Sequence, residues 1–265
     1  MTEESGPIVL MNRQNRVKLI AILAVAGFVA VWVLPPLRQP QSYHHFADER
    51  TLLGVPNFFN VVSNGAYLVF GVWGLVFLSR RSDLDVRGGF ISPGEKWPYA
   101  VFFVGVLLTC FGSGYYHWKP SDATLVWDRL PMTLGFMSML AATIAERISV
   151  RAGVRLLCPL LLAGMVSVWW WQRTGNLWPY AATQYLSLLL IVLMLALFPP
   201  RYTRGCDLAY ATGFYVLGKI AEALDAQIYQ ALGFMSGHSL KHLITALAPF
   251  WILRMLWQRG PAVQS

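Results

Sequence analysis

The chain has 265 residues, of which 56% are hydrophobic and only 13% are charged. Ordinary soluble domains carry about 25% charged residues, so this composition argues against a soluble globular protein. The formal net charge of +8 could suit nucleic acid, but the basic residues lie where membrane orientation requires them, and we expect no nucleic-acid partner. The three cysteines show no spacing typical of a disulfide framework or a cysteine metal site.

Eight apolar segments of about 17–25 residues, the length that spans a bilayer, follow one another along the chain. Short loops join them, and no compositionally distinct second half appears, so we predict an all-α, polytopic transmembrane helical bundle. The first segment ends in Leu34-Pro35-Pro36 without a small-residue cleavage site, which favours a retained helix over a signal peptide. The segments are Lys18–Leu34, Asn57–Ser79, Trp97–Tyr116, Thr124–Ala145, Val154–Trp171, Tyr180–Phe198, Asp207–Ala226 and Ser236–Trp257.

The basic residues predict the orientation of these spans. With the N-terminus in the cytoplasm, fourteen Lys and Arg residues lie in inner segments and four in outer loops. This asymmetry follows the positive-inside rule and places both termini in the cytoplasm. The inner residues are Arg13, Arg16, Lys18, Arg80, Arg81, Arg87, Lys96, Arg147, Arg151, Arg155, Arg201, Arg204, Arg254 and Arg259; the outer ones are Arg38, Arg50, Lys119 and Arg173.

Three histidines from distant parts of the chain are predicted to lie at one depth, on the outer side. His117 ends the third span, and His238 and His242 open the eighth. Residues four apart share a helix face, so His238 and His242 could bind one metal ion. With His117 they would make three nitrogen ligands, the set typical of catalytic zinc with an open position for water. Histidine pairs that only pack or form hydrogen bonds are the alternative.

Two further polar residues lie near His117. Ser113 precedes it by four residues and so shares its helix face, where a hydroxyl could stabilise an oxyanion or simply allow close helix packing. Asp128 follows a break at residues 119–121, and Pro131 frees the carbonyl group of Trp127 beside it. A buried carboxylate needs a partner, either Arg129 or a zinc-bound water. Asp128 would then act as a general acid/base, or it would only orient a ligand or form a structural ion pair.

These residues together resemble the alkaline ceramidase family, which belongs to a superfamily of seven-helix membrane hydrolases and progestin and adiponectin receptors. The resemblance rests on Ser113-x3-His117, on Asp128 eleven residues later, on His238-x3-His242, and on the first-helix stretch Gly54 to Leu75. It covers about Phe46 to Trp257, and the short loops resemble those of a prokaryotic member.

The resemblance implies a zinc-dependent intramembrane hydrolase that cleaves the amide bond of a ceramide-like lipid to a fatty acid and a long-chain base. In the implied mechanism a zinc-bound water attacks, Asp128 acts as acid/base and Ser113 lies near the oxyanion. The implied zinc ligands are His117, His238 and His242.

The chain departs from the family in two respects. One extra N-terminal helix precedes the seven-helix core, which divides the chain into a tail, first helix and outer loop (1–45), a ceramidase-like membrane domain (46–258) and a C-terminal tail (259–265). Animal members also carry an acidic calcium-binding segment. Here only Asp48 and Glu49 remain of it, and Asn57 stands where those enzymes have a glutamate, which weakens the case for Ca²⁺.

We therefore expect an integral membrane enzyme whose active site faces the periplasmic, extracellular or lumenal side and takes a lipid from the bilayer. The alternative is a non-catalytic, lipid-sensing receptor of the same superfamily with a structural zinc, which would need no Asp128. A transporter or haem protein is a third class, but broken helices and repeat symmetry, expected of a transporter, are not evident. On the seventh span, Lys219, Glu222 and Asp225 predict an internal ion-pair network.

Overall fold

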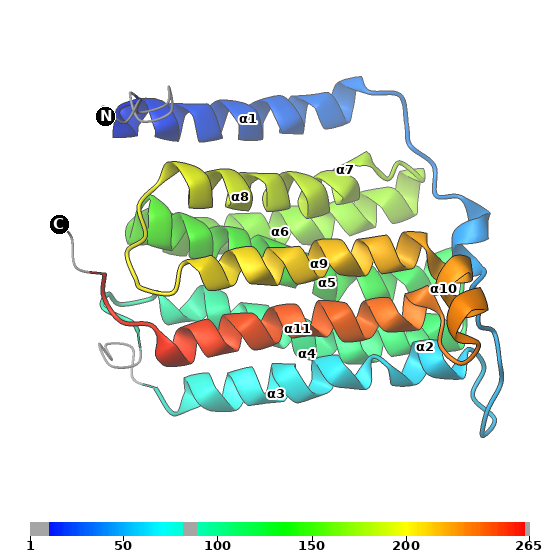
Figure 1. Ribbon diagram of the computed structural model, residues 1–265. Coiled ribbons are helices and arrows are strands. Elements are labelled where there is room, and N and C mark those ends of the chain that lie inside the picture. Colours follow the sequence, from blue (N-terminus) through cyan, green and yellow to red (C-terminus); the bar gives the residue numbers. More distant parts are fainter. Residues whose placement is uncertain (1–10, 82–88, 263–265) are drawn as a thin grey trace, which may run out of the picture.

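The computed structural model describes residues 11–81 and 89–262, and the regular elements in these ranges are all helices (Figure 1). The all-α prediction is confirmed, and each of the eight predicted segments coincides with helical structure. The elements are α1 (Arg13–Val33), a 3₁₀ turn (Gln41–His44), α2 (Phe58–Val62), α3 (Gly65–Ser79), α4 (Lys96–Trp118), α5 (Asp122–Arg147), α6 (Val150–Thr174), α7 (Trp178–Ala181), the π-helical η3 (Ala182–Leu186), α8 (Ser187–Leu197), α9 (Cys206–Ala223), α10 (Asp225–Leu232) and α11 (Gly237–Gln258).

Side-chain caps fix the start of the helices that carry the candidate site. The Ser121 side chain accepts a hydrogen bond from the backbone N–H of Thr124 at the start of α5. The Ser236 side chain accepts the N–H of Ser239 at the start of α11. Such a cap satisfies an otherwise unpaired N–H and contributes about 1 kcal/mol. Both caps lie within one or two turns of the polar residues singled out above.

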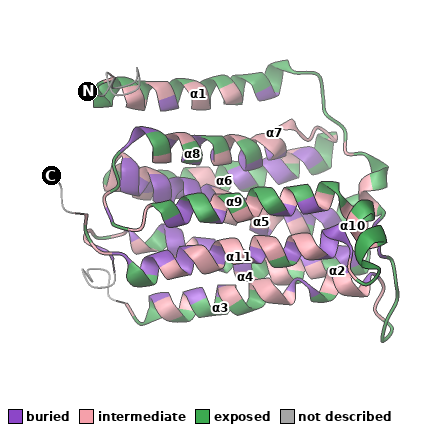
Figure 2. Cartoon of the chain, viewed as in Figure 1, coloured by how far each residue is buried: buried purple, intermediate pink, exposed green. Residues whose placement is uncertain are grey.

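The helices pack side by side as a bundle (Figure 1). Neighbouring contacts join α3, α4, α5, α8, α9 and α11 into a ring that closes from α11 back to α3. Outside this ring, α6 packs on α5, and α1 packs on α7, η3 and α8. Most of α1 is exposed (Figure 2), with Phe28 63% and Val33 77% accessible. An apolar helix this exposed needs an apolar solvent, which a bilayer provides.

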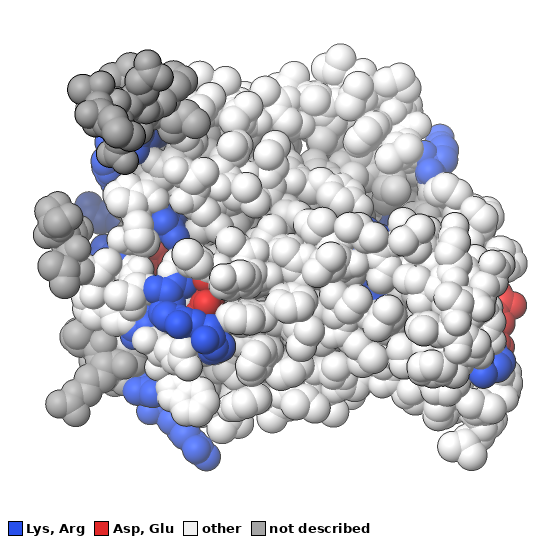
Figure 3. All heavy atoms as spheres, in the orientation of Figure 1, with Lys and Arg blue, Asp and Glu red and all other residues white. Residues whose placement is uncertain are grey.

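Five helical stretches are long and apolar enough to cross a membrane: α1, α2 with α3, α4, α6, and α7 through α8. The other three long helices, α5, α9 and α11, contribute the charged residues of the ring interior. Figure 3 shows a visible face almost free of charged side chains between its two ends, with Lys and Arg gathered mainly at the end where α1 begins and α11 ends. This pattern is typical of a protein embedded in a membrane.

The charged end of the bundle also contains Arg259, which the sequence assigned to the C-terminal tail. Its side chain is 2% exposed, donates to the carbonyl oxygen of Gly89 at 3.1 Å, and pairs with Glu146 and Tyr99. Arg259 therefore belongs to the packed end of the bundle. Arg87, one of the basic residues used to predict orientation, lies outside the described residues.

A close approach between α4 and α5 positions the candidate site. Pro131 has no N–H, so the carbonyl group of Trp127, one turn earlier, loses its intrahelical partner. Gly112 packs against this carbonyl: a methyl group at Gly112 would lie 2.8 Å from the carbonyl carbon. Only glycine allows this approach, which sets Ser113 beside Asp128. Gly114, two residues along the same helix, faces open space.

We predict that Gly112→Ala destabilises the protein by about 1–3 kcal/mol, the usual cost of overpacking, because the backbone of α5 must move. Gly114→Ala is the matched control and should be neutral or slightly stabilising. Thermal unfolding in detergent measures both variants. Equal melting temperatures for the two would contradict the close approach of α4 and α5.

Candidate metal centre

Three buried histidines meet at the end of the ring where α4 ends and α11 begins. His117 lies in the last turn of α4, and His238 and His242 lie one turn apart at the start of α11. One ring nitrogen from each lies within 4.8 Å of the other two, and the ring centroids are 4.8–5.2 Å apart. The three residues are 1–5% exposed. The structure thus brings together the three predicted histidines as a group that could hold a metal ion.

The hydrogen bonding of these rings fits a metal. Buried imidazole nitrogens normally have partners, and an unpaired one costs about 1–3 kcal/mol. Nδ1 of His117 and Nε2 of His242 are buried, yet neither has a hydrogen-bond partner among the described residues. A metal ion would satisfy both. Nε2 of His238, in contrast, has a partner, because it lies 2.9 Å from the ammonium group of Lys241.

Ser63, directly after α2, orients one of the rings. Its hydroxyl lies 2.8 Å from Nδ1 of His242. When Nδ1 carries the proton, it donates a hydrogen bond to the hydroxyl oxygen of Ser63. Nε2 then keeps its lone pair free for a metal ion. Such second partners of ligating histidines fix the tautomer and commonly change metal affinity about 10–100-fold. The polar face of α2 was the available signal for this contact.

Neighbouring amides on and before α2 hold the same region together. Asn57 donates to the carbonyl oxygen of His117 at 2.8 Å, and Asn60 accepts from the hydroxyl of Ser239 at 2.6 Å. Asn57 adopts a left-handed backbone conformation, with φ of 49°, which asparagine tolerates better than most residues. These bonds tie α2 to both histidine-bearing helices, α4 and α11.

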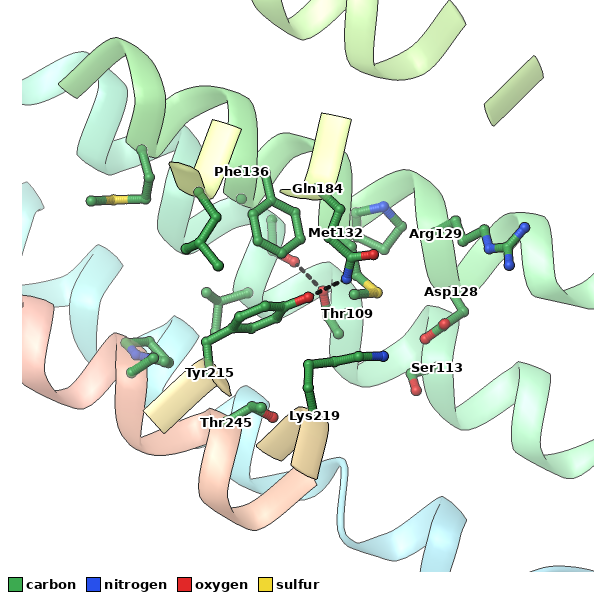
Figure 4. A pocket seen from close by; sticks show the side chains of 18 of the residues that line it. Thr109, Ser113, Asp128, Arg129, Met132, Phe136, Gln184, Tyr215, Lys219 and Thr245 are labelled. Atoms are coloured by element: carbon green, nitrogen blue, oxygen red, sulfur yellow. Dashed lines mark hydrogen bonds between the residues drawn. The ribbon is translucent and has the colours of Figure 1, made fainter. Parts of the chain in front are cut away.

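A cavity of about 400 Å³ lies inside the ring and reaches His242, one of the three histidines. Ser113, Asp128 and His242 all line it, and Figure 4 shows the side chains of Ser113 and Asp128 beside each other. The predicted site residues are therefore close in space, although they come from three helices. Most of the remaining lining is apolar, including Phe136 and Met132.

Arg129 does not pair with Asp128, which removes one of the two predicted partners of this carboxylate. In Figure 4 the two side chains leave α5 in different directions. The guanidinium group of Arg129 binds the side-chain oxygen of Gln39 and stacks over Trp171 and Tyr180, 3.9 and 4.6 Å from the ring centroids. The hydroxyl group of Ser113 lies beside Asp128 instead.

A second polar cluster lines the cavity next to the histidines. Glu222 forms ion pairs with Lys219 and with Lys241, the latter at 2.8 Å. The predicted internal network therefore exists, but Lys241 of α11 takes the place assigned to Asp225. Asp225 instead accepts the backbone N–H of His238 at 2.7 Å and that of Ala47 at 2.9 Å. It connects the outer loop to the start of α11.

The π-helical η3 contributes a polar pair that no motif in the sequence predicts. A π-helix widens the backbone by one residue, and such segments often occur at functional sites. The side-chain amide of Gln184, on η3, donates to the hydroxyl group of Tyr215 on α9 across the cavity (Figure 4). This pair lies among the apolar lining, beyond Asp128 and Ser113.

In the outer loop, Arg50 engages the carboxylate that a calcium ion would need. It donates to both oxygens of Asp48 at 2.8 Å and to the carbonyl oxygen of Phe234 at 2.8 Å. Burial raises the pKa of Asp48, but the hydrogen bonds from Arg50 outweigh it and lower the pKa overall. A calcium ion at Asp48 would have to displace this guanidinium group.

Comparison of the chain with models of known protein families and with curated protein sequences finds no match. The resemblance to alkaline ceramidases therefore rests on the residues described above. The geometry supports a metal site at three of them without naming the metal.

We predict that the purified protein holds about one tightly bound zinc ion per chain. His117→Ala, His238→Ala and His242→Ala should each reduce the zinc content sharply, because two nitrogens cannot replace three. His45→Ala is the matched control, since His45 lies in the outer loop with its side chain 80% exposed. Metal analysis by mass spectrometry measures all four variants. Full zinc occupancy in the variant lacking both His238 and His242 would refute this site.

Proposed function

We propose that this protein is a zinc-dependent membrane hydrolase of the alkaline ceramidase type, which cleaves the amide bond of a ceramide-like lipid. One observation carries the proposal: His242, one of three converging histidines, lines a cavity together with a carboxylate, Asp128, and a hydroxyl, Ser113. A structural metal site needs no such cavity and no such carboxylate. A hydrolase needs both, for the substrate and for the proton.

The roles of the residues follow from their positions. A bound zinc ion would supply an activated water near neutral pH and would polarise the substrate carbonyl. Asp128 accepts the proton from the attacking water and delivers it to the leaving nitrogen, because an amine leaves only when protonated. Ser113 donates a hydrogen bond to the oxygen that becomes negative. The three histidines would hold the zinc ion, and Ser63 orients the ring of His242.

The cavity suits a lipid substrate. Its volume of about 400 Å³ falls within the usual range for ligand pockets, about 300–1,000 Å³. Its apolar lining, which includes Phe102, Met139 and Ile252, would receive a hydrocarbon chain, while Ser113 and Asp128 line the same cavity as His242. This arrangement places the chain of the lipid along the bundle and its amide at the metal.

The proposal includes the orientation of the protein. In this proposal, α1 precedes a seven-helix core, which makes eight spans. Both termini then lie in the cytoplasm, and the metal centre lies at the periplasmic, extracellular or lumenal side. The charge asymmetry of the loops and the charged end of the bundle, where α1 begins and α11 ends, support this assignment. Helices α5, α9 and α11 are less apolar than the other spans because their charged side chains line the cavity.

The role of Asp128 gives the sharpest test. Asp128→Asn keeps the size of the side chain but removes its proton acceptor, so turnover should fall by about 10²–10⁴. Zinc content and melting temperature should stay unchanged. Asp122→Asn is the matched control, because Asp122 is an exposed carboxylate at the start of the same helix. The assay is release of fatty acid from a panel of lipid amides in liposomes.

Equal activity of wild type and Asp128→Asn would make Asp128 structural and the mechanism wrong. A zinc-loaded wild type that binds lipid but cleaves nothing in the panel would favour the receptor alternative instead.

Orientation is tested separately with two tags. A reporter fused after Ser265 should lie in the cytoplasm, whereas a tag in the loop at residues 119–121 should be reached by a membrane-impermeant reagent from outside. Protease protection of oriented vesicles provides an independent measurement. The reverse pattern would move the metal centre to the cytoplasmic side.

A further inference from the structure

Arg129 is a buried cation without an acidic partner. It lies about two turns into α5, next to Asp128, and is 4% exposed. Among the described residues, no Asp or Glu oxygen lies within ion-pair distance of it. Charged groups inside a membrane bundle are costly and are usually neutralised or functional. The contrast with Lys219 and Lys241, which share Glu222, makes Arg129 an exception.

The guanidinium group is stacked but incompletely hydrogen-bonded. Trp171 and Tyr180 lie against it, and Gln39 accepts from one terminal nitrogen, NH2. The other terminal nitrogen, NH1, is buried and has no partner among the described residues. An arginine has five N–H donors in one plane. Aromatic stacking leaves that plane free, so donors remain for a ligand.

The position of Arg129 shows which ligand could reach it. Arg129 and Gln39 both line the cavity, and Asp128, the neighbour of Arg129, lines it toward the metal centre. In Figure 4, Arg129 extends away from Phe136 and Tyr215, which lie on the other side of Asp128. A lipid whose chain runs past Phe136 and whose amide lies at the metal would present its polar head toward Arg129.

The charge of the cavity favours an anion in that place. Its described lining contains three basic side chains, Lys219, Lys241 and Arg129, and two acidic ones, Glu222 and Asp128. The cavity is therefore net positive even before a divalent metal binds. A structural brace that joins Gln39, Trp171 and Tyr180 would need neither the cavity position nor a charge, since a neutral side chain could pack there.

We propose that Arg129 binds an anionic oxygen group, a carboxylate or phosphate, on the head group of the lipid substrate. The planar fork of arginine matches such groups with two parallel hydrogen bonds. Gln39 holds the fork at the correct angle. The inference rests on the proposed hydrolysis of a lipid amide and specifies its substrate class, an acidic lipid amide.

The experiment compares two lipid amides of equal chain length, one with a carboxylate on the head group and one with a hydroxyl in its place. Wild type should cleave the acidic lipid with a kcat/KM at least about 10-fold higher. Arg129→Gln should lose about 10- to 100-fold on the acidic lipid, mainly through KM, and little on the neutral one. Arg129→Lys should recover part of the loss. Arg173→Gln is the matched control, since it removes an exposed positive charge from the same side.

Equal loss on both lipids in Arg129→Gln, or no preference of wild type for the acidic lipid, would overturn the inference and leave Arg129 a structural brace. The wild-type comparison holds even if the variant does not fold. Inorganic phosphate serves as a second probe: if it binds wild type but not Arg129→Gln with millimolar or better affinity, while wild type shows no preference for the acidic lipid, the site takes a free anion and not a lipid head group.

A binding measurement separates this inference from the proposed function. Calorimetry with both lipids on zinc-depleted protein, where no cleavage occurs, should show tighter binding of the acidic lipid that depends on Arg129. If binding follows this pattern while zinc-loaded protein cleaves neither lipid, the hydrolase proposal fails and acidic-lipid recognition stands. If cleavage occurs without the binding preference, the inference fails alone.

Discussion

The convergence of three buried imidazole rings is the constraint on which the rest of the structure depends. Histidines buried to this degree cannot exchange hydrogen bonds with solvent, so each nitrogen needs a partner in the protein or a metal. The structure supplies Ser63 to His242 and Lys241 to His238. It leaves one nitrogen of His117 and one of His242 unpaired, and a shared metal ion accounts for both.

The packing of the helices serves this convergence. Gly112 lets α4 approach the carbonyl group that Pro131 frees on α5, which brings Asp128 next to Ser113. Amides at α2 bind the end of α4 and the start of α11, the two elements that carry the histidines. The polar groups that make this interior expensive to bury are therefore also the groups that fix its geometry. Removing one of them would loosen the site before it unfolded the bundle.

The sequence was a good guide to the helices and to the residues that meet. Apolar length located all eight long helical segments, and the four-residue spacing of His238 and His242 placed both rings on one face of α11. The topology deduced from the basic loops predicted that His117 lies at the same depth as these two rings. These inferences succeed because helix periodicity and span length are set by the backbone and the bilayer, and neither depends on side-chain detail.

The contacts of long, flexible side chains could not be predicted in the same way. Arg129 could have paired with its neighbour Asp128, but it turns to Gln39 and two aromatic rings. Lys241 lies between two histidines in sequence, yet it is its reach to Glu222 that completes the ion-pair cluster. The helices that carry such groups, α5, α9 and α11, also fall below the apolarity expected of a span. A search for apolar spans therefore misses helices whose charged side chains line the cavity.

The most direct test of the central claim is the coordination of the metal itself, measured by zinc-edge X-ray absorption on the purified protein. Three histidines predict a first shell of nitrogen and oxygen at about 2.0–2.1 Å, with the outer-ring scattering typical of three imidazoles. A shell containing sulfur, or one with no imidazole scattering, would contradict the assignment of His117, His238 and His242 as ligands.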